Sequence, residues 1–253
     1  MTTPPFRVLL FSKTTGYRHA SIPAALSALT RLSTASTTSS TPFTVHASED
    51  ASLFTPESLA GYRVIVLVHV SGTFLSASQL GALQSFVRGG GGVVVVHTAS
   101  VGMPSDGEDI VDEDGWYQRM VGASFAGHPE PQMGVIKVED ATHPIMARGL
   151  RGLGDGLESF DDDTHRRRWF DEWYNFKESP RTLSYVHVLL SVEEASYQGG
   201  TLGDDHPLIW CHEFEGGRVF HTALGHLDAA YVDEMFMGQV LNGILWTAKM
   251  INV

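Results

Sequence analysis

The sequence predicts an α/β protein built on a doubly wound, mostly parallel sheet flanked by helices. Short, almost uninterrupted apolar runs such as "RVLLFS" and "GVVVVHTAS" are typical of strands that are buried on both faces of a parallel sheet. Helical patterns separate these runs, so that the first hundred residues are expected to run β-α-β-β-α-β. A length of 253 residues with 43% hydrophobic and 18% charged residues fits a globular protein, which we expect to form one domain over residues 1–253.

The elements can be justified in order along the first part of the chain. The strand 7–12 leads into a helix that Ser21 can cap, with Pro23 in its first turn. Strands are expected at 43–48, 62–72 and 92–100, with a capped, glycine-terminated helix "SASQLGALQSFVRGGGG" before the last of these. The Ser/Thr-rich stretch 33–42 is interpreted as a solvated loop without a role.

The second part of the chain is less regular. A short helix is expected in "EDGWYQRMVGASF", a strand in "QMGVIKVED" and an exposed charged loop in "DDDTHRRR". Three strand-like runs follow, "VHVLLSVEE", "PLIWCHEF" and "RVFHTALG", with Gly216–Gly217 as the turn between the last two. The amphipathic segment "DEMFMGQVLNGILWTAKM" is expected to be the closing helix.

Composition narrows the function classes. A net charge of -12 disfavours a polyanionic partner, so we expect no nucleic-acid binding. No apolar run reaches the length of a membrane span, and the first residues lack a basic leader, so we expect a cytoplasmic protein. The single cysteine, Cys211, excludes an internal disulfide; it lies inside a predicted strand and is interpreted as a small buried residue rather than a nucleophile.

Histidines gather where the predicted parallel strands end. The first strand is followed by Tyr17, Arg18 and His19, the third by His69, the fourth by His97, Thr98 and Ser100, and the last long strand by His226. Ligands of open α/β sheets bind at the carboxyl ends of the strands, so His19, His97 and His226 are expected to share one pocket. A lone strand-end histidine is often only a structural hydrogen-bonding group, and we interpret His46 and His187 in that way.

The segment "DEWYNF" supplies further candidates. In an extended chain Glu172 and Tyr174 point to one side and Trp173 to the other, so Glu172 and Tyr174 are expected to reach the histidine pocket. His128, between Gly127 and Pro129, is a candidate to close the site from a loop. Arg18 could instead pair with a surface carboxylate, and the aromatic residues of "DEWYNF" could simply belong to the core.

Several motif-based functions are excluded. "GGGG" precedes a strand, whereas a dinucleotide fingerprint follows one, and neither a Walker motif nor a G-x-S-x-G elbow occurs. The sequence also lacks H-E-x-x-H and paired cysteines. His19, His97 and His226 with a carboxylate could still hold a divalent metal such as zinc, although we expect no cofactor and favour a metal-free site.

Segments spread over nearly the whole chain resemble the trehalose-utilisation (ThuA-like) family. They are "VLLFSKTTGYRHASIPAAL", "GGGVVVVHTAS", "WYQRMVGASFAGHP", "VEDATHPI", "DEWYNF", "DDHPLIWCHEFEGGRVFHTALGH" and "LNGILWTA". The resemblance implies a flavodoxin-like fold similar to the class I glutamine amidotransferases. The nucleophile of those enzymes would sit where this chain has His97 and Thr98, so glutaminase activity is not expected. It also implies a role with trehalose and related disaccharides, alongside sugar dehydrogenases that make 3-keto glycosides.

Our first hypothesis is an enzyme that acts on a disaccharide or its 3-keto derivative by acid–base chemistry. His19, His97, His226 and Glu172 are the candidate catalytic residues. Substrate contacts are expected from Tyr17, Arg18, Ser100, Trp116, His128 and Tyr174. The alternatives are a non-catalytic sugar-binding or regulatory protein and a metal-dependent hydrolase. The expected partner is a small carbohydrate, and a homo-oligomer remains an option.

Overall fold

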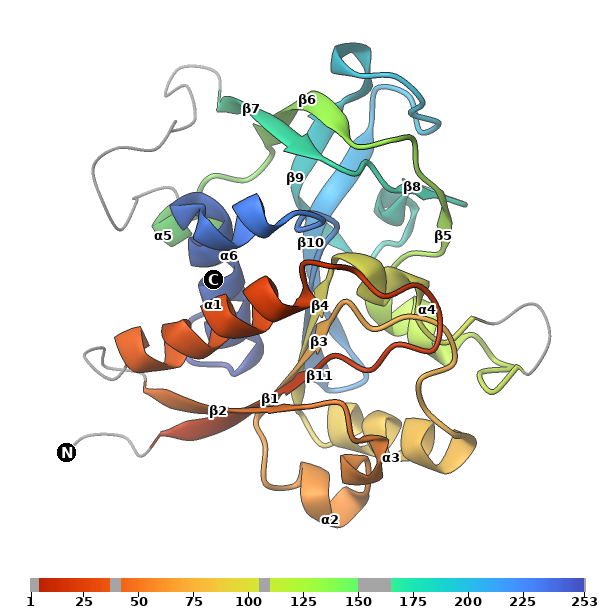
Figure 1. Cartoon of the computed structure of the whole chain (residues 1–253), viewed down its shortest axis with the longest axis vertical. Coiled ribbons are helices and arrows are strands. Elements are labelled where there is room, and N and C mark those ends of the chain that lie inside the picture. The colour runs from red at the N-terminus through yellow and green to blue at the C-terminus, as the bar shows by residue number, and fades with distance from the viewer. Residues whose placement is uncertain (1–4, 37–41, 105–109, 150–164, 253) are drawn as a thin grey trace.

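The computed structural model describes residues 5–36, 42–104, 110–149 and 165–252 (Figure 1). Within these residues nine strands form one sheet, and two further short strands pair with each other. The strands of the sheet are β1 (Phe6–Phe11), β2 (Phe43–Ser48), β3 (Val64–Val68), β4 (Gly92–Val96), β6 (Gln132–Val138), β7 (Arg166–Asp171), β9 (His187–Glu193), β10 (His206–Phe214) and β11 (Gly217–Thr222). The short pair is β5 (Phe125–Gly127) and β8 (Asn175–Phe176).

The helices cover both faces of the sheet. They are α1 (Ile22–Ser36), α2 (Pro56–Leu59), α3 (Ala77–Arg88), α4 (Trp116–Val121), α5 (Pro144–Gly149) and α6 (Glu234–Thr247). In Figure 1, α1 and α6 lie on one side of β1, β3 and β4, while α3 and α4 lie on the other. The expected α/β architecture with flanking helices is confirmed.

The sheet is mixed rather than mostly parallel, which corrects the sequence prediction. Its strand order is β2-β1-β3-β4-β11-β10-β9-β6-β7. The pairs from β2 to β11 are parallel, whereas those from β11 to β7 are antiparallel. The change occurs at the hairpin between β10 and β11, because a connection of two residues can only join antiparallel strands.

Burial explains why the parallel half was visible in the sequence. All five residues of β3 and all five of β4 are buried, and both strands consist of β-branched and other apolar residues, apart from Gly92. Their parallel register, from Val64 opposite Gly92 to Val68 opposite Val96, brings the residues that follow them to the same edge of the sheet. This edge carries the candidate site.

Helix starts follow ordinary capping chemistry. Ser76 accepts a hydrogen bond from the backbone N–H of Gln79, whose side chain accepts the Ser76 N–H in return, which completes a capping box at α3. Asp233 accepts from the backbone N–H of Phe236 at the start of α6 and also pairs with Arg167 of β7. This ion pair ties α6 to the antiparallel half of the sheet.

Three local expectations need correction or lie outside the described residues. The turn between β10 and β11 consists of Glu215 and Gly216, and Gly217 already begins β11. In "DDDTHRRR", positions 161–164 lie outside the described residues, and the three arginines belong to β7 instead of a loop, where they pair with β6. In the Ser/Thr-rich stretch α1 continues to Ser36, while positions 37–41 lie outside the described residues.

Candidate functional site

Four side chains from four distant segments meet at the carboxyl edge of the parallel strands. One ligand-type atom from each of His19, His97, His226 and Glu172 lies within 4.8 Å of the other three. The Glu172 carboxylate oxygen Oε2 is 3.3 Å from His97 Nε2, 3.3 Å from His226 Nδ1 and 3.9 Å from His19 Nε2. We call these four residues the His/Glu cluster.

His97 enters the cluster directly from the end of β4. Its φ of 53° is in the left-handed region, so the chain turns sharply as it leaves the strand and enters the short 3-10 helix His97–Val101. Its Nδ1 lies 2.6 Å from the carbonyl oxygen of Ala223, which can only accept, so Nδ1 carries the ring proton. In the neutral ring Nε2 is therefore a bare lone pair that points toward Glu172.

A chain of hydrogen bonds sets the orientation of His19. The Tyr231 hydroxyl donates to the carbonyl of Gly225 at 2.9 Å, so it accepts from Nε2–H of His69 at 2.6 Å. The other nitrogen of His69 then accepts the single proton of the Thr98 hydroxyl, at 3.4 Å. Thr98 consequently accepts from Nδ1–H of His19 at 2.9 Å, which leaves Nε2 of His19 bare and facing the cluster.

Asp171 holds two members of the cluster by their backbones. Its buried carboxylate accepts the N–H groups of Glu172, Gly225 and His226, at 2.9, 2.9 and 3.0 Å, and the indole N–H of Trp169 at 2.8 Å. All four donors are neutral, so the carboxylate is compensated entirely by hydrogen bonds. The "TALGH" loop and the "DEWYNF" segment are thereby held against each other.

The alternation predicted for "DEWYNF" is present. Glu172 and Tyr174 face the cluster, where the Tyr174 ring stacks on His97 with centroids 4.4 Å apart and its hydroxyl donates to Thr98. Trp173 is fully buried on the other side, against Gly134 and Tyr197. The predicted loop residue His128 also arrives, with its Nδ1 3.1 Å from Glu172 Oε1. Glu172 thus lies among four imidazoles.

A pocket of about 390 Å³ opens onto the cluster. It is lined by His19 and His226, by the residues that follow them and by Tyr17, whose side chain is 69% exposed. The Tyr17 ring lies edge-on to the His19 ring at 4.8 Å. Tyr17 therefore offers an exposed aromatic ring at the mouth of the pocket, on which a sugar can stack.

The pKa values of the cluster residues shift in different directions. Burial alone raises the pKa of Glu172, but the imidazoles of His19, His226 and His97 outweigh it and hold that pKa well below its ordinary value. Burial lowers the pKa of His19, whereas the interaction with Glu172 raises the pKa of His226. Two histidines whose pKa values move apart at one site form a pattern typical of acid–base pairs.

Three of the predicted substrate-contact residues lie elsewhere. Arg18 forms an exposed ion pair with Glu49 at 2.7 Å, the alternative noted from the sequence. Ser100 is buried and its hydroxyl donates to the carbonyl of His97, so it supports the turn and does not face the pocket. Trp116 is 2% exposed, and its indole N–H donates to Glu215 in the β10–β11 turn, which leaves no free face for stacking.

Cys211 matches its sequence interpretation. It is buried within β10, 3.7 Å from His143, and burial raises the pKa of its thiol to about 12. A thiol in this environment is neither deprotonated near neutral pH nor accessible.

Sequence reasoning gave no role to four residues that organise the cluster: His69 and Thr98, which it named only as strand-end residues, and Asp171 and Tyr231. The first two follow strands whose ends were already identified, and the positive φ of 51° at His69 parallels that at His97. Asp171 precedes the selected Glu172 and could have been found as the one carboxylate beside it. Tyr231 carried no usable signal, because its role depends on where the loop after β11 folds back.

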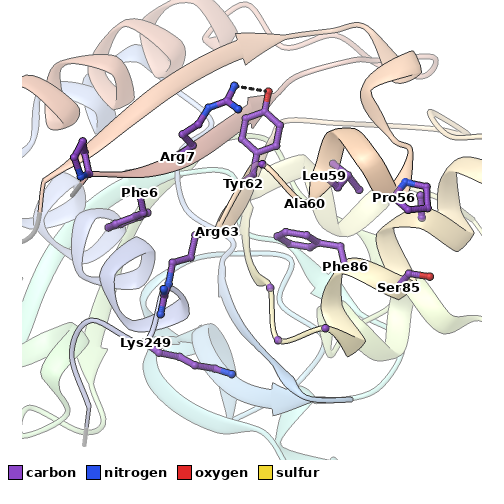
Figure 2. Close-up of a pocket in the computed structure, with 16 residues that line it drawn as sticks. Phe6, Arg7, Pro56, Leu59, Ala60, Tyr62, Arg63, Ser85, Phe86 and Lys249 are labelled. Atoms are coloured by element: carbon purple, nitrogen blue, oxygen red, sulfur yellow. Dashed lines mark hydrogen bonds between the residues drawn. The ribbon is translucent and has the colours of Figure 1, made fainter. Parts of the chain in front are cut away.

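A larger pocket of about 800 Å³ lies at the opposite edge of the sheet, where β1, β3 and β4 begin (Figure 2). Its cationic side chains already have partners: Arg7 donates to the Tyr62 hydroxyl, Arg63 to the carbonyl of Ala248, and Lys249 to that of Gly216. It contains none of the predicted site residues. The smaller pocket at the cluster is therefore the better functional candidate.

Comparison with known proteins agrees with this architecture. The family model "ThuA: Trehalose utilisation" matches residues 7–247. A ThuA-like protein from Bacteroides uniformis has a similar solved structure, with a TM-score of 0.73 at 21% identity over 98% of this chain and 93% of that chain. A ThuA-like protein from Parabacteroides merdae gives a TM-score of 0.67 at 18% identity, over 99% and 93% of the two chains.

More distant structures share the fold. A cytoplasmic protein from Salmonella typhimurium gives a TM-score of 0.55 at 12% identity, over 95% of this chain and 98% of that chain. No curated protein matches the sequence. Among the described residues, no helix combines the length and the apolar character needed to cross a membrane. Because the family model covers nearly the whole chain, this protein belongs to the ThuA, or trehalose-utilisation, family.

Proposed function

We propose that this protein is an enzyme that acts on trehalose-type disaccharides or their 3-keto derivatives by proton transfer at the His/Glu cluster. The family supports this substrate class, since its model is described as trehalose utilisation. The cluster supports the chemistry, because imidazoles can accept and donate protons close to neutral pH and four of them surround the buried carboxylate of Glu172. The position of Glu172 among these rings is the observation that carries the proposal.

The reaction that best fits such a site is elimination from a 3-keto glycoside. The ketone at carbon 3 acidifies the hydrogen on carbon 2, so a base of the cluster can remove that proton. The electron pair left on carbon 2 forms a double bond to carbon 1 as the glycosidic C–O bond breaks. A protonated imidazole then gives its proton to the departing oxygen. Addition of water to the double bond completes hydrolysis, and reprotonation of the enolate without bond cleavage gives isomerisation.

The pocket is compatible with a sugar ring. Its volume of about 390 Å³ lies within the usual range for small-molecule sites. Tyr17 provides an exposed aromatic ring at the mouth, and Asp228, another lining residue, can accept a hydrogen bond from a hydroxyl. We expect one ring of the disaccharide to enter toward the cluster while the second remains near Tyr17.

The test combines turnover with proton exchange. We expect 3-keto-trehalose to lose its carbon-2 proton to D2O in the presence of the protein, followed by cleavage or isomerisation, both measured by NMR. Unoxidised trehalose lacks the acidifying ketone and is expected to remain unchanged. If the keto sugar shows no deuterium exchange and no turnover, the proposal is contradicted.

The second candidate is a non-catalytic sugar-binding protein, which the exposed ring of Tyr17 favours. Binding of either sugar, measured by calorimetry, without deuterium exchange would support it.

We further propose that the protein works in the cytoplasm, as the names of two Salmonella neighbours state for those proteins, and that its partner is a small carbohydrate. We also include assembly into a homo-oligomer among the proposed properties of the protein.

A further inference from the structure

We propose that His19, His97, His226 and Glu172 bind one divalent transition-metal ion. The inference rests on the proposed function for the role of the site, but metal binding can be measured without any sugar. Three of the four donors are imidazole nitrogens, which suit zinc and neighbouring transition metals, whereas calcium and magnesium prefer oxygen ligands.

Unpartnered nitrogen atoms are the first observation. His97 Nε2 and His226 Nδ1 are both buried and have no hydrogen-bond partner among the described residues. Each is 3.3 Å from Glu172 Oε2, but a proton placed on either nitrogen would not line up with that oxygen or another acceptor. Lone pairs and a carboxylate facing one another in a buried space repel unless a cation lies between them.

The spacing of the donors is the second observation. Two ligands on a tetrahedral ion, at bonds of about 2.0–2.1 Å, lie about 3.3–3.4 Å apart. The two separations from Glu172 Oε2 to His97 and His226 are 3.3 Å each, and that to His19 is 3.9 Å. The four atoms lie within 4.8 Å of one another, so a small side-chain rotation closes the widest pair. His226 is the least buried of the four side chains.

Outer hydrogen bonds are the third observation. Metal-binding histidines typically donate their second ring N–H to a carbonyl or another acceptor, which fixes the orientation of the ring. His97 donates its Nδ1–H to the carbonyl of Ala223, and His19 donates its Nδ1–H to Thr98. The chain from Thr98 through His69 and Tyr231 to Gly225 keeps His19 in the form whose Nε2 is free to bind.

A bound ion would change which groups transfer protons without changing the class of reaction. Because four side chains fill a tetrahedral ion, it would draw electron density from a sugar carbonyl or hydroxyl oxygen only by taking that oxygen as a fifth ligand, which acidifies the neighbouring hydrogen. The cluster nitrogens would then be occupied as ligands. His128, whose Nδ1 lies 3.1 Å from the second Glu172 oxygen, is not one of the four proposed ligands.

The experiment measures metal directly. The purified protein is stripped with a chelator, dialysed against Zn²⁺ or Co²⁺, and analysed for metal content, for the visible absorption of Co²⁺ and by X-ray absorption at the zinc edge. We expect about one ion per chain with imidazole ligands, in line with a four-ligand protein site. Wild-type protein that retains no ion, or an ion without imidazole neighbours, would overturn the inference.

Variants locate the ion. His226→Ala and Glu172→Gln are expected to weaken zinc binding at least about 100-fold, beyond the range of about 10–100-fold typical of outer partners. Tyr231→Phe breaks the hydrogen-bond chain behind His19 and should weaken binding within that outer range. The matched control is Tyr197→Phe, which removes a hydroxyl that contacts His206, a histidine outside the cluster, and should leave binding unchanged.

Two results separate this inference from the proposed function. Turnover of the keto sugar by fully stripped protein would overturn the metal's catalytic role while the proposed function stands. Metal binding at the cluster with no turnover of any sugar would retain the metal site and remove the proposed function. Equal zinc affinity in the wild type, His226→Ala and Glu172→Gln would place the ion elsewhere and overturn the inference.

Discussion

The carboxylate of Asp171 accepts the backbone N–H of His226 at 3.0 Å, across 55 positions of sequence. The same carboxylate accepts the N–H groups of Gly225 and Glu172, so one buried side chain holds two of the four segments that contribute side chains to the cluster. Asp171 therefore positions Glu172 and His226 through their backbone N–H groups, without a hydrogen bond to the histidine rings.

Asp171→Asn tests this link. The amide group keeps one accepting oxygen but turns an N–H donor toward backbone donors, so at least one buried N–H loses its partner. We expect the free energy of unfolding to fall by about 1–3 kcal/mol and turnover of the keto sugar to fall with it. Urea denaturation and an activity assay on the folded fraction measure both effects. Unchanged stability would show that Asp171 does not hold the two segments.

Glu172→Gln is expected to act on the chemistry more than on the fold. The amide has nearly the same shape but neither the charge nor the basicity of the carboxylate, so turnover should fall about 100- to 10,000-fold. The matched control is Glu194→Gln, which alters another glutamate–histidine contact, the one with His206 at 2.7 Å. Turnover by the control should stay close to wild type. Similar losses in both variants would indicate a general effect of such pairs on the structure.

The fold was predictable where burial dominates the sequence pattern. β3 and β4 are apolar throughout because helices cover both faces of the parallel half, and the residues of these strands therefore stand out. The hairpin of β10 and β11 was expected from its turn, but the antiparallel pairing of β6, β7 and β9 was not predicted, because strand direction depends on connections. β7 was missed for a different reason: three of its residues are arginines, and their placement depends on partners such as Asp233 on α6.

The site was predictable in its members but not in its support. The strand-end rule brought together His19, His97 and His226, and alternation placed Glu172 on their side of the chain. Neither rule predicts the hydrogen bonds that determine which nitrogen of each imidazole ring carries the proton. Those bonds involve Thr98, His69 and Tyr231, whose mutual distances exist only in the folded chain.

Acid stability should depend on His212, which lies in β10 outside the cluster. Its Nε2 contacts the carbonyl of Met120 at 2.9 Å, and burial lowers its pKa to about 4. The unfolded chain takes up this proton near pH 6.5, so the unfolded state binds more protons between about pH 6.5 and 4 and stability falls as pH decreases through that window. The contribution is about 3 kcal/mol.

His212→Gln removes the titrating group and can still donate to Met120. The loss of unfolding free energy between pH 7 and about pH 4, measured in urea, should then be smaller by about 3 kcal/mol than in the wild type. His143, whose pKa burial also lowers to about 4, remains in both proteins and contributes equally to each. An identical pH dependence in the two proteins would contradict the assignment to His212.

Gly134 fixes the position of the "DEWYNF" segment through Trp173. A Cβ atom at position 134 would lie 2.7 Å from Cζ2 and 3.0 Å from Cε2 of the buried indole, so Gly134→Ala forces Trp173 to move. Because Glu172 and Tyr174 flank Trp173, we expect a loss of about 1–3 kcal/mol in stability and a lower turnover.

Gly81→Ala, in α3 with nothing within 4 Å of the new methyl group, should instead raise the free energy of unfolding by about 0.5–1 kcal/mol. Calorimetry gives the melting temperature of each variant, and turnover is measured at a temperature below both melting transitions. The two variants are then compared for stability and for activity. Full activity in Gly134→Ala would mean that the segment adjusts without moving Glu172, and that the indole does not set its position.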